Sequence, residues 1–262
     1  MKRKPIAFCP EDFPEELRSL VSRYALYDSS CSRDARVWML DGKERFFLKS
    51  SAAGALKTEA DMTRYFHSKG LGAEVLDYFT TDRDWLLTRA VPGEDCTFPG
   101  YTAHPKRLCD TAASLLRQLH EQHHEDCPVQ EHSAAYLDTV HRNYLAGFCD
   151  LQLFPEREWG FSSPEEAWSL VEKNEIYLNN DTLLHGDYCL PNILLDNWQF
   201  SGFIDLGCGG IGDRHVDLFW GIWSLHFNLK TNQYRDRFLD VYGRELINED
   251  VFRIISAFEV FG

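Results

Sequence analysis

The sequence predicts an α+β protein in two parts, a small antiparallel sheet with one key helix and then a mainly helical region. Strand-forming segments flank the turn "DGKE", residues 41–44, and indicate a β-hairpin. Apolar residues at helical spacing prevail beyond residue 104. The breaker-rich segment "VPGED" separates the two patterns. We therefore expect an N-terminal lobe over residues 1–90, a hinge over 91–95 and a C-terminal lobe over 96–262.

The individual elements follow from local signals along the chain. Residues 10–27 predict a short helix, and "RFFLKS", residues 45–50, predicts the returning strand of the hairpin. Residues 54–70 have a helical period that ends at Gly70. Two strands are expected around the turn 80–84. Farther on, we expect helices over residues 105–124, 163–176, 215–229 and 249–261, and short strands over 192–196 and 200–206.

Composition restricts the partners of the protein. Its residues are 44% hydrophobic, which is enough for a core, but no apolar run is long enough to span a bilayer. The start "MKRKPIAF" is not followed by an apolar signal segment, so we expect a cytoplasmic protein with no membrane contact. The eight scattered cysteines predict free thiols. A net charge of −14 repels nucleic-acid phosphates and suits a cationic small molecule.

Three oxygen-bearing side chains follow or precede two neighbouring short strands. Asp187 and Asn192 lie in the loop before "ILL", residues 193–195, and Asp205 lies at the end of "SGFID". If the two strands form a hairpin, both loops open at the same end and gather these groups. Asn192 and Asp205 fit Mg²⁺, which takes few protein oxygens, and Asp187 is then free to accept a hydroxyl proton.

A cation for phosphate groups is expected at Lys49, which ends the strand "RFFLK". In the following helix Glu59 shares one face with Ala55, Met62 and Phe66, so it interrupts an apolar stripe. A carboxylate in that position should seek a partner, and Lys49 is close in sequence. The alternative is a solvated glutamate on the edge of the helix.

Four motifs carry a resemblance to a known family. The loop "HGDYCLPN", residues 185–192, resembles the catalytic loop of the aminoglycoside phosphotransferases, where His-x-Asp is followed by Asn five residues later. "SGFIDLG" resembles their metal-binding segment, and "LLTRAVPGED" resembles the segment that connects their lobes. "LRQLH…DCP" resembles the next helix. The resemblance spans residues 29–261 and is nearest to the aminoglycoside 3′-phosphotransferases.

The resemblance implies a bilobal protein-kinase-like fold that uses ATP or GTP with Mg²⁺. Asp187 would be the catalytic base and would contact the acceptor substrate. Lys49 would hold the α- and β-phosphates, and Glu59 would orient Lys49. Asn192 and Asp205 would bind the metal. Phosphoryl transfer needs these groups because it depends on in-line positioning and on cations around the moving phosphoryl group.

The resemblance also implies contacts with the rest of the nucleotide. The carbonyl of Arg89 and the amide of Val91 would meet adenine. The polar run at residues 29–32, which includes Ser29 and Ser30, would close over the phosphates.

Two further residues concern the catalytic loop itself. His185 is expected to hold the loop together by hydrogen bonds, with a catalytic histidine as the alternative. Asp217 is expected to anchor the loop from below, with a charge at a helix start as the alternative.

Acidic residues near the end of the sequence are expected to bind the ammonium groups of a cationic small-molecule acceptor. By the resemblance, Glu259 matches a terminal acidic position and Asp150 approximately matches another. Phe258 stands where the subgroup has a second acid, and Cys208 stands where it usually has arginine.

These observations predict a phosphotransferase that moves the γ-phosphate of ATP or GTP to a hydroxyl of an aminoglycoside antibiotic and so confers resistance. Two alternatives remain open. One is a kinase of the same fold for another acceptor, such as choline, a sugar amine or a macrolide. The other is a nucleotide-binding module without catalysis. We expect a monomer or a weak dimer.

Three other patterns have simpler interpretations. "GCGGIG", residues 207–212, matches a dinucleotide fingerprint, but the strand before it is expected in a hairpin and not in a parallel βαβ unit. The histidines of residues 120–124, with Cys127, have the spacing of a zinc site, but we expect a solvated helix end there. The tryptophans are expected to pack in the core or lobes, at positions 159, 168, 198, 220 and 223.

Overall fold

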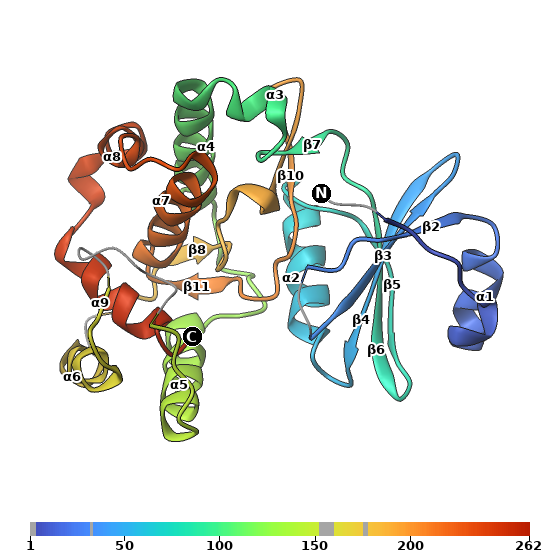
Figure 1. Ribbon diagram of the computed structural model, residues 1–262, viewed down its shortest axis with the longest axis horizontal. Coiled ribbons are helices and arrows are strands. Elements are labelled where there is room, and N and C mark those ends of the chain that lie inside the picture. The colour runs from blue at the N-terminus through green and yellow to red at the C-terminus, as the bar shows by residue number, and fades with distance from the viewer. Residues whose placement is uncertain (1–3, 32–33, 152–159, 175–177) are drawn as a thin grey trace. The chain divides into compact units, whose positions relative to one another are not determined.

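The computed structural model describes residues 4–31, 34–151, 160–174 and 178–262. The chain divides into two compact units, of which the first comprises Met1–Cys96 and Pro191–Cys208 and the second Thr97–Leu190 and Gly209–Gly262 (Figure 1). Residues 191–208, which we expected in the C-terminal lobe, group with the first unit because β9 (Ile193–Asp196) pairs with β7 (Glu94–Asp95). The functional division into lobes and hinge stays a prediction.

The first unit is built on a six-stranded antiparallel sheet in the order β1-β2-β3-β4-β6-β5. Its strands are β1 Lys4–Pro5, β2 Ala25–Asp28, β3 Arg36–Asp41, β4 Arg45–Ala52, β5 Val75–Thr80 and β6 Arg83–Arg89. Its helices are α1 Glu15–Val21 and α2 Lys57–Ser68, with a 3-10 turn at Pro10–Asp12. The expected hairpin is β3–β4, whose register pairs Asp41 with Arg45 across the turn.

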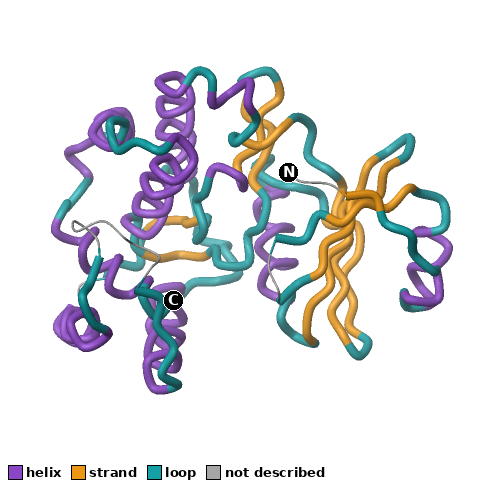
Figure 2. The backbone as a smooth tube through the Cα atoms, in the orientation of Figure 1, coloured by secondary structure: helices purple, strands orange, loops and turns teal. Residues whose placement is uncertain are grey.

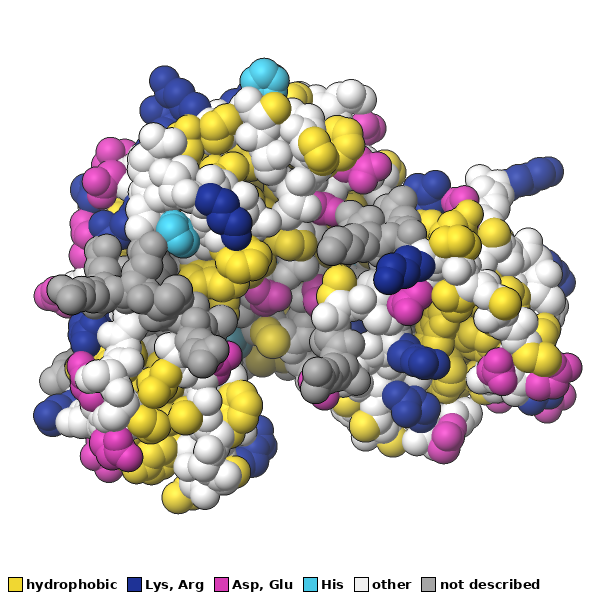
Figure 3. Space-filling model, viewed as in Figure 1, with side chains coloured by type: hydrophobic (Ala, Val, Ile, Leu, Met, Phe, Trp, Pro, Cys, Tyr) yellow, Lys and Arg dark blue, Asp and Glu magenta, His cyan; other side chains and the backbone are white. Residues whose placement is uncertain are grey.

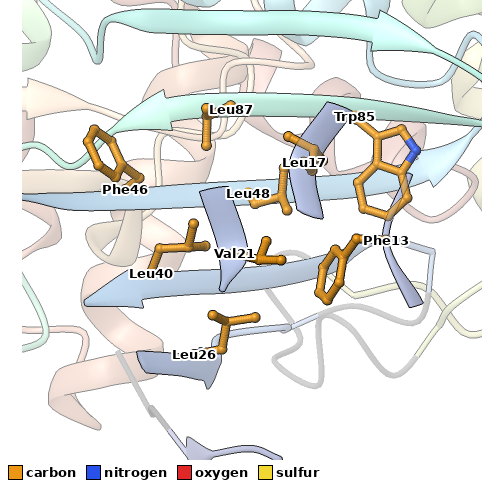
Figure 4. Close-up of a cluster of buried hydrophobic side chains, with 9 residues drawn as sticks. All are labelled: Phe13, Leu17, Val21, Leu26, Leu40, Phe46, Leu48, Trp85 and Leu87. Atoms are coloured by element: carbon orange, nitrogen blue, oxygen red, sulfur yellow. The ribbon is translucent and has the colours of Figure 1, made fainter. Parts of the chain in front are cut away.

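The two faces of this sheet are covered by different helices. Trp85 and Leu87 of β6 belong to an apolar cluster that includes Leu17 and Val21 of α1 (Figure 4). Leu86, between them, belongs to a second cluster with residues of the α2 segment. Successive residues of a strand point to opposite faces, so α1 and α2 cover opposite faces. The complete first cluster is Phe13, Leu17, Val21, Leu26, Leu40, Phe46, Leu48, Trp85 and Leu87.

This alternation also orients Lys49. Lys49 of β4 pairs with Leu86 of β6, and Leu48 pairs with Leu87. Cross-strand partners lie on the same face, so Lys49 is on the α2 face and Leu48 is on the α1 face. A shift of the strand register by one residue would turn Lys49 away from α2.

A second, three-stranded sheet of the first unit has the order β10-β9-β7. β10 (Gln199–Phe203) pairs antiparallel with β9, which confirms the predicted hairpin. Asn197 and Trp198, at the tip, have φ of 50° and 69°, which suits a tight two-residue hairpin turn. Gly93 has φ of 93°, and a Cβ there would collide with the carbonyl oxygen of Leu195, so the approach of the chain to β9 requires glycine.

The second unit is mainly helical, as predicted (Figure 2). Its helices are α3 Pro99–Thr102, α4 Pro105–His120, α5 His132–Leu145, α6 Pro164–Asn174, α7 His215–Leu229, α8 Arg235–Tyr242 and α9 Asp250–Glu259, with a 3-10 turn at Arg244–Leu246. A two-stranded antiparallel sheet joins β8 (Thr182–Leu184) to β11 (Gly210–Gly212). A further 3-10 turn, Leu190–Asn192, leads from this unit into the first.

Two predictions about local structure need comment. The helix expected within residues 10–27 is shorter, because Ala25–Asp28 is a strand in which Leu26 pairs with Leu40. Such pairing to a distant segment is not visible in local spacing. The glycine-rich segment 207–212 contains β11, whose ladder with β8 is antiparallel, as is the ladder of β10 with β9. A dinucleotide-binding unit needs a parallel βαβ arrangement, so that alternative is not supported.

The described helices and one face of the surface bear on membrane spans and on the distribution of charge. In the part of the chain that the structure describes, none of the helices combines the length and apolar content needed to cross a bilayer. On the face drawn in Figure 3, basic and acidic side chains are interspersed. The net charge of −14 is therefore not gathered into a single patch on that face.

Candidate active site

Lys49 is the centre of a charged cluster in the first unit. Its Nζ lies 2.7 Å from Oε2 of Glu59 and 2.7 Å from Oδ1 of Asp205, and it donates a hydrogen bond to each. The Lys49 side chain is 19% exposed and that of Glu59 is 11% exposed, whereas that of Asp205 is 51% exposed. The expected pairing of Lys49 with Glu59 is therefore present, and the solvated-glutamate alternative is wrong.

Within this cluster, burial and neighbouring charges have opposing effects on the pKa values of Lys49 and Glu59. Burial disfavours the charge on Lys49, but Asp205 and Glu59 outweigh this effect and raise the pKa of the ammonium group. Burial raises the pKa of Glu59, and the Lys49 charge opposes that rise. One cation between two carboxylates leaves a net negative charge, which favours a further cation nearby.

Asn192 lies beside Asp205 because the β9–β10 hairpin brings the two loops together. The N–H of Ile204 donates a 3.1 Å hydrogen bond to the Asn192 carbonyl, and Phe203 pairs with Ile193. Asp205 itself has φ of 60°, in the left-handed region that residues other than glycine seldom adopt. Such strain is typical of functional positions, where the surrounding structure holds an otherwise unfavourable conformation.

The donor set fits a magnesium ion that arrives with a nucleotide. Asn192 offers an amide oxygen and Asp205 offers a half-exposed carboxylate, and Mg²⁺ uses one or two such groups with phosphates and water. Within the described residues, no three or more His, Cys, Asp and Glu side chains form a complete metal cage. The residues present therefore suit a metal shared with substrate phosphates.

The other predicted nucleotide contacts lie at or just after the ends of strands of the first unit. Ser29 and Ser30 follow β2, where Ser29 is buried and the Ser30 hydroxyl accepts a 3.0 Å hydrogen bond from the N–H of Val37. Ser32, in the same run, lies outside the described residues. Arg89 ends β6, and its guanidinium forms ion pairs with Glu44 and Glu74. These ion pairs hold the Arg89 side chain.

Val91 follows β6 and packs closely on the β10 strand. A Cβ on Gly202 would lie 3.1 Å from Cγ1 of Val91, so glycine leaves the space that Val91 fills. In the described chain, the N–H of Val91 has no backbone hydrogen-bond partner. It can therefore donate to an adenine nitrogen.

In the second unit, the loop that carries Asp187 is tied down through its backbone. The buried carboxylate of Asp217 accepts hydrogen bonds from the N–H of His185 at 2.7 Å and of Gly186 at 2.8 Å. The N–H of Asp187 donates to Nδ1 of His185 at 3.3 Å, and Asp187 is partly exposed. Asp217 thus anchors the loop as predicted, and His185 contributes a hydrogen bond within it.

Asp217 is itself held by His120, which sequence analysis placed at a solvated helix end. That prediction is wrong: His120 is 8% exposed, with Nε2 3.1 Å from Asp217 and Nδ1 2.8 Å from the hydroxyl of Tyr242. Burial lowers the pKa of His120, so we assign a neutral ring that donates from Nε2 and accepts from Tyr242. Burial opposes the charge on Asp217, but the donors around it outweigh this and lower its pKa.

The two predicted acceptor-binding acids differ in their surroundings. Glu259 is 8% exposed, and its Oε1 accepts hydrogen bonds from the hydroxyl of Tyr136 at 2.7 Å and from Nε1 of Trp220 at 3.0 Å. Burial raises the pKa of Glu259 to about 7, and the charge of Asp187 adds to the rise. Asp150 is exposed, and its N–H donates to the Val260 carbonyl at 2.8 Å.

The structure therefore groups the predicted residues in two sets. The first unit contains Lys49, Glu59, Asn192 and Asp205, and the second contains Asp187, Asp150 and Glu259.

Sequence analysis missed His120, Tyr242, Tyr136 and the polar role of Trp220. For His120 a signal existed, since it follows Ala112 and Leu116 at intervals of four on the buried face of α4. The Trp159 prediction lies outside the described residues.

Comparison with known proteins identifies the family of the chain. The model of the phosphotransferase enzyme family APH matches residues 28–254. A probable aminoglycoside 3′-phosphotransferase of Lactococcus lactis subsp. lactis (strain IL1403) is 47% identical over 253 residues, which cover 96% of each chain.

Solved structures give the same result. An aminoglycoside-3′-phosphotransferase of type VIII matches with a TM-score of 0.77 and 26% identity, over 94% of this chain and 97% of that one. An aminoglycoside phosphotransferase from Streptomyces rimosus, solved with ADP and streptomycin, has a TM-score of 0.73 and 21% identity, over 94% and 95% of the two chains. These matches confirm the kinase-like fold. The chain therefore belongs to APH, the phosphotransferase enzyme family, together with the aminoglycoside 3′-phosphotransferases.

Proposed function

We propose that this protein transfers the γ-phosphate of ATP or GTP to the 3′-hydroxyl of an aminoglycoside and thereby inactivates the antibiotic. The observation that carries the proposal is the Lys49 cluster, in which one ammonium group bridges Glu59 and Asp205 at 2.7 Å each. The 47% identity to a probable aminoglycoside 3′-phosphotransferase supports the choice of acceptor.

In the first unit, the cluster is suited to hold and neutralise a nucleotide triphosphate. Lys49 offers its ammonium to the α- and β-phosphates, and Glu59 keeps that ammonium on the α2 face of the sheet. Asn192 and Asp205 are the residues that would hold Mg²⁺. When bound, Mg²⁺ would offset the negative charge of the β- and γ-phosphates. The backbone around Arg89 and Val91 supplies hydrogen-bonding groups for the base.

In the second unit, the anchored loop presents the base. Two backbone bonds to Asp217 fix the segment immediately before Asp187, so that its carboxylate meets the acceptor hydroxyl in a constant orientation. Asp187 takes the hydroxyl proton as the oxygen bonds to the γ-phosphorus and the bond from phosphorus to the bridging oxygen breaks, leaving ADP or GDP. Transfer adds a dianion to a polycation that must bind RNA phosphates, which weakens that binding.

An acceptor panel tests this function. Nucleoside diphosphate release is measured with Mg-ATP or Mg-GTP and, separately, kanamycin B, its 3′-deoxy form, choline and a macrolide. We expect turnover with kanamycin B and none with the 3′-deoxy form, and ³¹P–¹H NMR of the product should place the phosphate on the 3′-oxygen. Turnover of the 3′-deoxy form would refute the position of transfer. Turnover of choline or the macrolide alone would refute the acceptor class.

A further inference from the structure

The buried carboxylate of Glu259 has an unusual set of partners. Both hydrogen bonds fall on the same oxygen, Oε1, and both donors are neutral: the phenol of Tyr136 on α5 and the indole N–H of Trp220 on α7. In the described part of the chain, no Lys, Arg or His forms an ion pair with Glu259. A carboxylate that is 8% exposed is thus solvated by two dipoles and by no countercharge.

This environment disfavours the ionised form of the Glu259 carboxyl group. Burial is the largest influence on Glu259 and raises its pKa to about 7. The hydrogen bonds from Tyr136 and Trp220 act in the opposite direction and lower the pKa. Other titratable groups near it include Asp187, whose charge raises the pKa of Glu259, and the thiol of Cys189, which interacts with both acids. On α5, the ring of His132 stacks on that of Tyr136, with 5.9 Å between the ring centroids. Without the two donors, the carboxylate would be protonated over more of the neutral pH range.

The second oxygen, Oε2, accepts no hydrogen bond among the described residues and lies next to Gly262, where a Cβ would be 2.9 Å from it. An ionised carboxylate accepts hydrogen bonds on both oxygens, and here Tyr136 and Trp220 occupy Oε1 from two different helices. Two fixed donors on one oxygen restrict rotation of the carboxylate and direct Oε2 away from them. A cationic group that approaches Oε2 then finds a buried charge that lacks a countercharge, a situation in which an ammonium ion gains most.

We propose that Trp220 and Tyr136 are positioning residues for acceptor recognition, which keep the Glu259 carboxylate ionised and oriented for an ammonium group of the acceptor. This inference rests on the proposed function, since it takes Glu259 as a contact of the cationic acceptor. It adds that acceptor affinity depends on two neutral side chains that need not touch the acceptor themselves, and that this affinity falls as the pH drops through 7.

The test uses Trp220→Phe and Tyr136→Phe in the full-length protein, with the best acceptor of the panel. Loss of one hydrogen bond to a charged group should raise the KM for the acceptor about tenfold. The KM for the nucleotide and kcat should stay within about twofold, because Lys49 and Asp187 are unchanged. Tyr136→Phe removes a single hydroxyl group, so it provides an independent result if Trp220→Phe is poorly folded.

The pH profile separates positioning from a merely structural effect. For the wild type, kcat/KM for the acceptor should rise as the pH increases through about 7. In either variant the midpoint should move to higher pH, because a donor that stabilised the carboxylate is gone. The deficit relative to wild type should therefore be larger at pH 6 than at pH 8.5. A deficit that is the same at all pH values would overturn the inference.

A double-mutant cycle and a control complete the design. Trp220→Phe should add little to the KM of Glu259→Gln, because it acts through the carboxylate that this variant lacks. Trp85→Phe loses a comparable indole hydrogen bond, to Thr81 in the first unit, and should leave the acceptor KM unchanged. If Glu259→Gln raises the acceptor KM but both single variants do not, the inference fails while the proposed function stands. If Glu259→Gln has no effect, the acceptor role of Glu259 fails as well.

Discussion

In the first unit Lys49 satisfies two carboxylates with one ammonium group, whereas in the second unit Asp217 is held by two backbone N–H groups and His120. Both arrangements stabilise a buried carboxylate, that of Glu59 in the first unit and that of Asp217 in the second. They differ in whether they hold side chains or the main chain in place. The contacts of Lys49 are between side chains, and Asp205 stays 51% exposed. The contacts of Asp217 determine the path of the main chain.

The difference matches two tasks in phosphoryl transfer. A nucleotide and its metal must enter and leave, so their binding groups need charges that can exchange partners. The base must stay at one position relative to the acceptor, so its loop needs a rigid support. Exchange of side-chain ion pairs serves the first task, and buried hydrogen bonds to the backbone serve the second. Four variants, taken from the largest expected effect to the smallest, test this comparison.

The proposed base, Asp187, should give the largest effect. Asp187→Asn keeps the shape of the side chain but removes its ability to take a proton, so kcat should fall about 1,000-fold. Binding of Mg-nucleotide, measured by calorimetry, should change less than about threefold. Asp138→Asn, at an exposed position of α5, is the matched control and should retain full activity. A loss in kcat of less than tenfold would remove Asp187 as the base.

Asp217→Asn should damage both stability and turnover. One of the amide atoms would be a donor facing donors, so we expect a loss of about 3 kcal/mol in the free energy of unfolding, measured by urea titration. The kcat should also fall about tenfold as the loop before Asp187 loosens.

Asp213→Asn is a close control for this variant. Asp213 is equally buried and accepts hydrogen bonds from the Asn179 N–H and from His215, but it does not contact the loop at 185–187. The Asp213→Asn variant should lose about as much free energy of unfolding as Asp217→Asn, with little change in kcat. Equal losses of kcat in the two variants would mean that Asp217 supports the unit as a whole and not the loop.

Lys49→Met should show the opposite pattern. Without its ammonium group, kcat/KM for the nucleotide should fall about 100-fold, since one preorganised electrostatic contact is lost. The free energy of unfolding should change by only about 1 kcal/mol, because Asp205 can be solvated and Glu59 can take up a proton. Lys57→Met removes an exposed lysine of α2 that pairs with Asp61, and it should be neutral. A stability loss as large as that of Asp217→Asn would erase the contrast between the units.

Glu259→Gln should stabilise the protein, and the gain should depend on pH. The folded state keeps the Glu259 proton up to a pKa of about 7, whereas the unfolded state releases it near 4.5, so wild-type stability falls as the pH rises between these values. Glutamine does not ionise, so the variant does not lose stability in this way as the pH rises. The variant should therefore gain about 2 kcal/mol at pH 8 relative to its difference at pH 4, measured by urea unfolding at both values. Glu172→Gln, at an exposed position, should show no such pH-dependent gain.

Much of the site was predictable because its signals are local. The segment 185–192 carries its candidate functional residues within eight positions, and Lys49 and Glu59 are ten residues apart on a strand and the next helix. The β9–β10 hairpin was visible from two short apolar segments with a turn between them, and it places Asn192 beside Asp205. Alternation along β4 then decides which face Lys49 occupies.

The residues that were missed act over long separations in sequence. His120 lies 97 residues from Asp217 and 122 from Tyr242, and Tyr136 lies 123 residues from Glu259. Each partner sits on its own helix with an ordinary amphipathic pattern, so nothing local marks the pair. The strand at Ala25–Asp28 was missed for the same reason, because its stability comes from pairing with β3.

The sequence by itself determined the candidates for the chemistry of this protein: which side chains could carry charge to a phosphate, which could accept a proton, and which local elements present them. Only the tertiary structure decided which buried acids are stabilised by which donors, as with Trp220 and Tyr136 around Glu259. The physical reason is that a pattern of apolar residues specifies which face of a helix is buried. The partner of a polar group on that face depends on how helices from distant parts of the chain pack together.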